Sequence, residues 1–101
     1  MSVISVSKAQ RQLAGNTRER RLQMDLTQEG LAVRSGVSVR TLRKFEQEGI
    51  ISLESFLKLY AVLGGMDRLI SATAPVVAPF TSIDEVLQQD TEPKRKRGRR
   101  K

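Results

Sequence analysis

Between residues 27 and 65, small hydroxyl side chains that suit helix starts alternate with glycines that suit helix ends. A Ser or Thr just before a helix accepts hydrogen bonds from the first free backbone N–H groups. A glycine just after a helix adopts the left-handed conformation that ends it. This alternation predicts three consecutive helices. The starts are Thr27, Ser38 and Ser52, the ends are Gly36, Gly49 and Gly64–Gly65, and the helices cover about residues 28–35, 39–47 and 53–63.

The flanking segments are also helical in pattern. Residues 8–24 predict a first helix, and any bend would fall near Gly15–Asn16, two poor helix formers. Residues 66–70 predict a short fifth helix. Residues 8–70 contain no sustained run of alternating β-branched residues and no Asn-Gly or Asp-Gly hairpin signal. We therefore expect an all-α fold, with a five-helix domain over residues 1–70.

The C-terminal part of the chain differs in composition. Residues 71–81 contain Pro75 and Pro79 and have no helical period, which predicts an extended linker. Ser82 and Glu85 form a capping box in the acidic segment 82–93, and this predicts a short helix at 83–89. Residues 94–101 read KRKRGRRK and predict a disordered basic tail.

The composition excludes several classes of protein. The 101 residues include no cysteine and no histidine, so thiol enzymes, zinc fingers and histidine-based acid–base catalysis are excluded. We expect no metal, no cofactor and no enzymatic activity. The apolar stretches are short and the N-terminus lacks the pattern of a signal peptide, which indicates a cytoplasmic protein without a membrane span.

The net charge of +7 does not by itself indicate DNA binding by the folded part. Seven of the 18 basic residues lie in the tail, which leaves 11 basic and 11 acidic residues in 1–93. The basic residues of the tail are Lys94, Arg95, Lys96, Arg97, Arg99, Arg100 and Lys101. A flexible arm that contacts DNA phosphates is the leading interpretation of the tail, beside a partner-binding role, a solubility feature or an import signal.

Two short helices separated by Gly36 form a helix-turn-helix pattern. Leu31 and Ala32 share one face of the first of these helices. Val37, Leu42 and Phe45 supply a buried face for the second, which is narrow enough to enter a major groove about 12 Å wide. The remaining positions of the second helix would face outward. They are Ser38, Val39, Arg40, Arg43, Lys44 and Gln47.

The stretch LTQEGLAVRSGVSVRTLRKFEQEG, residues 26–49, resembles the helix-turn-helix of the Xre or phage-repressor (Cro-like, lambda-repressor-like) family, and the likeness extends over about residues 13–64. The resemblance implies a sequence-specific repressor that binds double-stranded DNA as a homodimer on a palindromic operator. It implies base contacts by Ser38, Val39, Arg40 and Lys44, phosphate contacts by Gln28, Arg43, Gln47 and Arg18, and a structural ion pair between Arg21 and Glu46.

The sequence departs from that family at several positions. Ser35, Thr17 and Arg20 are polar where apolar residues are common, which predicts a thinner core completed by dimerisation. Val39 replaces a residue that often hydrogen-bonds a base. Because valine has no hydrogen-bonding group, it reads only a thymine methyl or the local DNA shape. The operator sequence therefore does not follow from the resemblance.

The arrangement of helix-turn-helix, proline-containing linker, acidic segment and basic tail is similar, more narrowly, to HipB-like antitoxins, which restrain HipA-type kinase toxins. A HipA-like kinase toxin is then an expected partner. The acidic segment and the residue pair just before it contain four apolar residues that form either a docking element for that partner or a frayed end. They are Phe80, Ile83, Val86 and Leu87. The alternatives are a stand-alone Xre-type regulator, such as a phage repressor or restriction controller, and a protein-interaction adaptor.

Overall fold

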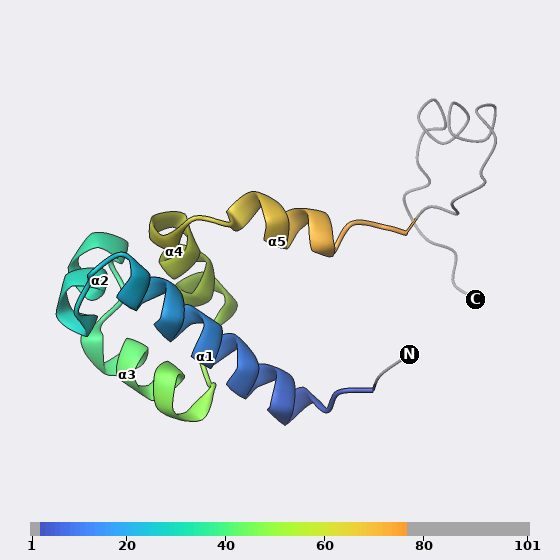
Figure 1. Ribbon diagram of the computed structural model, residues 1–101, viewed down its shortest axis with the longest axis horizontal. Coiled ribbons are helices and arrows are strands. Elements are labelled where there is room, and N and C mark those ends of the chain that lie inside the picture. The colour runs from blue at the N-terminus through green and yellow to red at the C-terminus, as the bar shows by residue number, and fades with distance from the viewer. Residues whose placement is uncertain (1–2, 77–101) are drawn as a thin grey trace.

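The computed structural model describes residues 3–76, and every regular element in that range is an α-helix. The five helices are α1 (Val6–Gln23), α2 (Gln28–Ser35), α3 (Val39–Glu48), α4 (Leu53–Leu63) and α5 (Met66–Ala72). Helices α1 to α4 enclose the core, and α5 projects from the end of α4 on the side away from α2 and α3 (Figure 1). The all-α prediction with five helices over the domain is confirmed.

The predicted caps start three of the helices. The side chains of Thr27, Ser38 and Ser52 accept hydrogen bonds from the backbone N–H groups of Gly30, Thr41 and Ser55 at 2.9, 3.1 and 3.1 Å. Gly36 and Gly49 end α2 and α3 with φ angles of 81° and 78°, as glycine end signals do. Local chemistry therefore fixes the limits of α2 and α4, which agree with the predicted ranges.

Helices α1, α3 and α5 differ from their predicted ranges at one or both ends. Helix α1 begins at Val6, because Ser5 accepts from the Lys8 N–H and caps it, and it continues unbroken through Gly15–Asn16 to Gln23. Helix α3 includes Glu48. Helix α5 continues to Ala72, so residues 71–72 are helical and not part of an extended linker. The predicted helix at 83–89, the basic tail and the four candidate docking residues lie outside the described residues.

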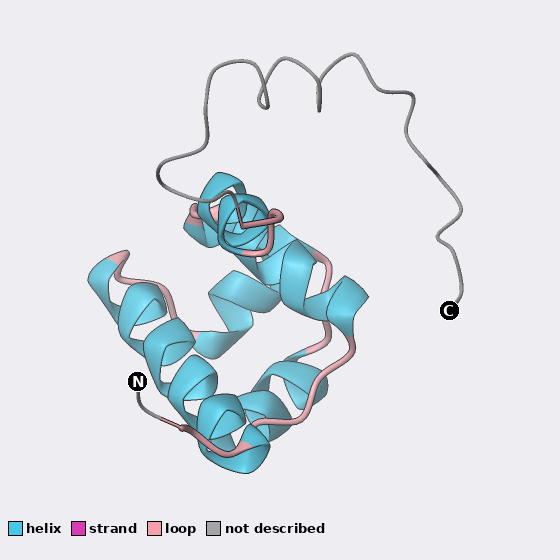
Figure 2. Ribbon diagram, turned by 90° about the vertical axis from the view of Figure 1, so that its right-hand side faces the viewer, coloured by secondary structure: helices cyan, strands magenta, loops and turns pink. Residues whose placement is uncertain are grey.

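The core is small and is contributed by α1 to α4 and the turn between α2 and α3. Leu31, Leu42 and Leu59 are fully enclosed, and Phe45 is 2% exposed. Ala14, Val37, Tyr60 and Leu63 complete the buried set. Phe45 packs edge-on against Phe56, with ring centres 5.8 Å apart. Figure 2 shows the helices surrounding this interior.

The polar residues Thr17 and Ser35 are accommodated by hydrogen bonds, and completion of the core by dimerisation stays a prediction. Thr17 is fully buried on α1; its hydroxyl donates to the Leu13 carbonyl at 2.8 Å and shares a hydrogen bond of 3.0 Å with the Tyr60 hydroxyl. Ser35 donates to the Ala32 carbonyl and accepts from the Val37 N–H at the turn. Within the described residues, no buried side-chain nitrogen or oxygen lacks a partner.

Candidate DNA-binding interface

Helix α3 has two distinct faces. Leu42 and Phe45 point into the core, whereas Arg40 and Lys44 are exposed to solvent. Among the other predicted contact residues, Ser38, Arg43 and Gln47 are exposed and Val39 is half-buried. The structure therefore leaves almost the whole predicted contact face of α3 open. An exposed helix of this size can enter the major groove of DNA.

A buried ion pair joins α1 to α3. The Arg21 Nε donates to Glu46 Oε2 at 2.8 Å, and Arg21 Nη2 donates to Glu46 Oε1 at 3.0 Å. The two side chains are only 8% and 4% exposed. Arg21 also donates to the Leu26 carbonyl at 2.9 Å, which ties down the turn before α2. A planar fork of this kind fixes orientation as well as distance.

Gln28, at the start of α2, belongs to the same network. Its Nε2 donates to Glu46 Oε1 at 3.0 Å, so one carboxylate holds side chains of α1 and α2 against α3. No sequence pattern predicts this hydrogen bond, because the spacing of Gln28 and Glu46 indicates only that both lie near the helix-turn-helix. A phosphate contact by the other amide N–H of Gln28 stays a prediction.

Two further contact residues already have partners in the free protein. The Ser38 hydroxyl accepts from the Thr41 N–H and donates to Thr41 Oγ1 at 3.0 Å. Arg43 lies 3.5 Å from the Glu29 carboxylate on α2, and both side chains are about half exposed or more. Arg18 is exposed on α1. An exposed ion pair contributes little to stability, so Arg43 is free to exchange Glu29 for a phosphate.

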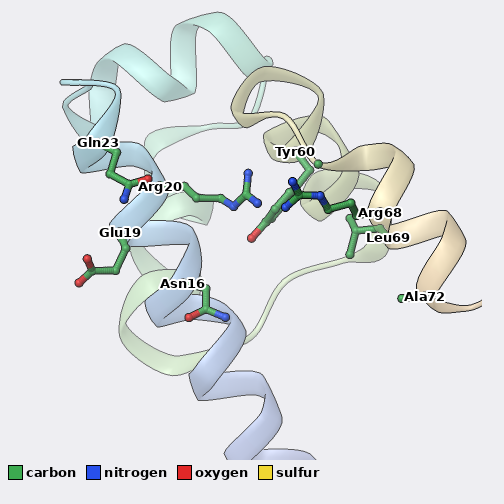
Figure 3. A pocket seen from close by; sticks show the side chains of 9 residues that line it. Asn16, Glu19, Arg20, Gln23, Tyr60, Arg68, Leu69 and Ala72 are labelled. Atoms are coloured by element: carbon green, nitrogen blue, oxygen red, sulfur yellow. The ribbon is translucent and has the colours of Figure 1, made fainter.

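A second group of side chains, not predicted as a site, lies between α1 and α5. A hollow of about 510 Å³ is lined by residues of α1, α4 and α5, and Arg20 and Arg68 both point toward Tyr60 in it (Figure 3). Arg20 donates to the Gly64 carbonyl at 3.1 Å, and its guanidinium lies 5.5 Å from the centre of the Tyr60 ring. In the sequence, Thr17 and Arg20 stand out only as polar residues at positions where apolar residues are common in the family.

The described residues hold no cluster of three or more acidic, cysteine or histidine side chains placed to bind a metal ion. Over the same part of the chain, none of the helices has both the length and the apolar character needed to span a bilayer.

Comparison with known proteins identifies the central part of the chain. A family model described as helix-turn-helix matches residues 18–67, from the middle of α1 to the start of α5. No curated protein and no solved structure matches the chain. The matched range contains the buried Arg21–Glu46 pair, the turn at Gly36 and all of α3. Residues 18–67 thus form a helix-turn-helix domain, the type of domain that DNA-binding transcription regulators use.

Proposed function

We propose that the protein is a sequence-specific transcriptional repressor that binds a palindromic operator as a homodimer. Each α3 enters a major groove, with half-sites about one helical turn, roughly 34 Å, apart. Ser38, Val39, Arg40 and Lys44 contact base edges, and Gln28, Arg43, Gln47 and Arg18 contact phosphates. A dimer bound over a promoter represses transcription because it excludes RNA polymerase.

The observation that carries this proposal is the contrast between the two faces of α3. Its inner face is anchored by Leu42, Phe45 and the buried Glu46, whereas Arg40 and Lys44 make no hydrogen bond or ion pair within residues 3–76. Exposed cationic side chains on a helix with a fixed orientation suit a partner with regularly spaced negative charges, such as the phosphates of DNA. Arginine and lysine also hydrogen-bond the major-groove edge of guanine.

To test the proposal, duplexes that bind the protein are selected from a random library, and the affinity for the selected site is then measured by titration. Arg40→Ala and Lys44→Ala should each weaken binding by about 1–3 kcal/mol and relax the sequence preference at the bases they contact. Lys58→Ala is the matched control, because Lys58 is an exposed lysine on α4. No selected duplex, or equal losses for random and selected DNA, would contradict sequence-specific binding.

For the dimer interface we propose α5. No residue of this helix is buried in the single chain, and Ile70 is 65% exposed. Leu69 of the same helix packs against the core, which leaves the exposed Ile70 side chain suited to contact with a second copy of the chain. Sedimentation of the wild-type chain should therefore show a dimer whose population depends on protein concentration.

The basic tail serves, in this proposal, as an electrostatic arm. Each phosphate that it neutralises steepens the dependence of log K on log salt by about 0.9. Deletion of residues 94–101 should therefore flatten the salt dependence and weaken binding to operator and random DNA about equally. A loss confined to the operator would instead indicate that the tail reads bases, as minor-groove arms do.

The antitoxin role is a narrower proposal that rests on the order of the sequence segments alone. In it, the dimer also binds a HipA-like kinase toxin through Phe80, Ile83, Val86 and Leu87. Affinity purification from the native host, with and without nuclease, tests this directly. A stoichiometric kinase-fold protein that survives nuclease supports the antitoxin role, and DNA without such a protein leaves a stand-alone regulator.

A further inference from the structure

The connection between α4 and α5 consists of two adjacent glycines in the left-handed region of backbone conformation. Gly64 and Gly65 have φ angles of 89° and 98°, and α5 begins at Met66 directly after them. We call residues 63–66 the elbow. Helix α5 has no fully buried residue and no side-chain cap, and Leu69 is its one residue that packs, partly buried, against the core. Contacts at the elbow therefore contribute to the direction of α5.

Arg20 of α1 makes the contacts that hold this elbow. Its Nη1 donates to the carbonyl oxygens of Gly64 at 3.1 Å and Leu63 at 3.4 Å. These are carbonyls at the C-terminal end of α4, where the helix dipole favours a cation. Figure 3 shows the Arg20 side chain reaching from α1 toward the Tyr60 ring of α4. The position of the Tyr60 side chain is itself fixed, since its hydroxyl forms a hydrogen bond with the hydroxyl of the buried Thr17.

The backbone at the elbow leaves room for the Arg20 guanidinium. A Cβ atom at Gly65 would lie 3.3 Å from Arg20 Nη1 and 3.4 Å from Nη2. Such an atom would require the guanidinium to shift by a few tenths of an ångström, and the φ angle of 98° disfavours any other residue. Gly65 therefore permits both the turn of the chain and the contact with Arg20.

We infer that Arg20 is a positioning residue that locks the elbow and so sets the orientation of α5 relative to α3. The next residue, Arg21, holds α3 through Glu46. Two consecutive arginines of α1 thus connect one rigid helix to both α3 and α5. Given the proposed dimerisation through α5, on which this step rests, Arg20 sets the distance between the two α3 helices of a dimer that contact DNA.

A distance measurement between α2 and α5 tests the inference without DNA. The sequence has no cysteine, so Arg34→Cys on α2 and Ser71→Cys on α5 give two unique spin-label sites on exposed residues. Labelled chains are mixed with excess unlabelled chains, so that each dimer carries one labelled pair. The wild type should give one narrow distance distribution, and Arg20→Ala should broaden or shift it. An unchanged distribution in Arg20→Ala overturns the inference.

Arg11→Ala is the matched control, because it removes an exposed arginine from the same helix. Arg20→Lys keeps the charge, but its side chain is shorter and lacks the guanidinium. It should broaden the distribution as Arg20→Ala does, with a helical circular dichroism spectrum like that of the wild type. This variant decides the question if Arg20→Ala does not fold.

Operator spacing gives a second readout that a purely stabilising residue would not move. Duplexes carry two copies of the selected half-site at different separations, and adding one base pair rotates one half-site by roughly a tenth of a turn. Arg20→Ala should reduce the preference for the wild-type spacing by about tenfold, as loss of one charge-assisted hydrogen bond would, with the half-site sequence unchanged. A retained spacing preference overturns the inference. Failure of the wild type to bind any duplex defeats the proposed function instead, and the spin-label result still tests Arg20.

Discussion

Helices α3 and α5 are attached to the same body in opposite ways. Helix α3 buries Leu42 and Phe45, and its Glu46 carboxylate receives hydrogen bonds from two other helices. Helix α5 buries none of its residues and joins the body through two glycines. The difference shows that one chain fully specifies the orientation of α3. The orientation of α5 depends on the packing of Leu69 against the core and on the contacts of Arg20 with the end of α4.

The arginines that contact α3 and the end of α4 lie in different environments. Arg21 is almost completely buried and faces a carboxylate, so its removal leaves an unpaired charge inside the protein. Arg20 is half-buried and faces neutral carbonyl groups, so its removal leaves carbonyls that water can reach. We therefore expect changes near α3 to reduce the stability of the fold, and changes near α5 to affect geometry and assembly.

The largest effect on stability is expected from Glu46→Ala. This change leaves the buried Arg21 guanidinium without its carboxylate, and breaking a buried pair in this way typically costs about 3–5 kcal/mol. Urea unfolding monitored by circular dichroism measures the loss. Glu54→Ala is the control, because its pair with Lys58 is exposed and should contribute only about 0.3–0.5 kcal/mol. Similar losses in both variants would contradict the assignment of Glu46.

An intermediate effect is expected at the buried hydroxyl pair between α1 and α4. Thr17→Val leaves the Tyr60 hydroxyl without its partner in the core, which should cost about 1–3 kcal/mol. Tyr60→Phe should cost less, about 0.5–1.5 kcal/mol, because the Thr17 hydroxyl still donates to the Leu13 carbonyl. The same urea measurement compares the two. A larger loss for Tyr60→Phe would contradict this ranking, because phenylalanine keeps the ring and removes only the hydroxyl.

The smallest effect on the fold is expected from Ile70→Asp. The side chain is largely exposed in the single chain, so the free energy of unfolding of the monomer should change by no more than about 0.5 kcal/mol. The dimer should nevertheless be lost, because the change places a charge in an apolar contact. Sedimentation at several concentrations tests this. A dimer that persists would place the interface elsewhere.

Local sequence signals predicted most of the fold. The limits of α2 and α4 followed from Thr27, Gly36, Ser52 and Gly64, because capping depends only on neighbouring residues. The end of α5 was missed because no glycine or cap marks it, and the helix simply continues to Ala72.

Long-range partners were harder to predict. The pairing of Arg21 with Glu46 came from a family resemblance, whereas the contacts of Arg20 join residues 43 and 44 positions apart. Nothing in the local sequence selects which of the three arginines in 18–21 faces the elbow. The hydrogen bond from Gln28 to Glu46 was missed for the same reason, since it depends on how α2 and α3 pack.

The way α3 is attached to the core bears on how the proposed DNA preference can change over evolution. All the side chains that orient the helix lie on its inner face, and those at Arg40, Lys44 and Gln47 contribute no hydrogen bond or ion pair within residues 3–76. Mutations at these three positions are therefore nearly neutral for folding. On the proposed function, in which Arg40 and Lys44 contact bases, a lineage that carries this domain can acquire a new operator by substitutions at these two positions, without first gaining stability elsewhere.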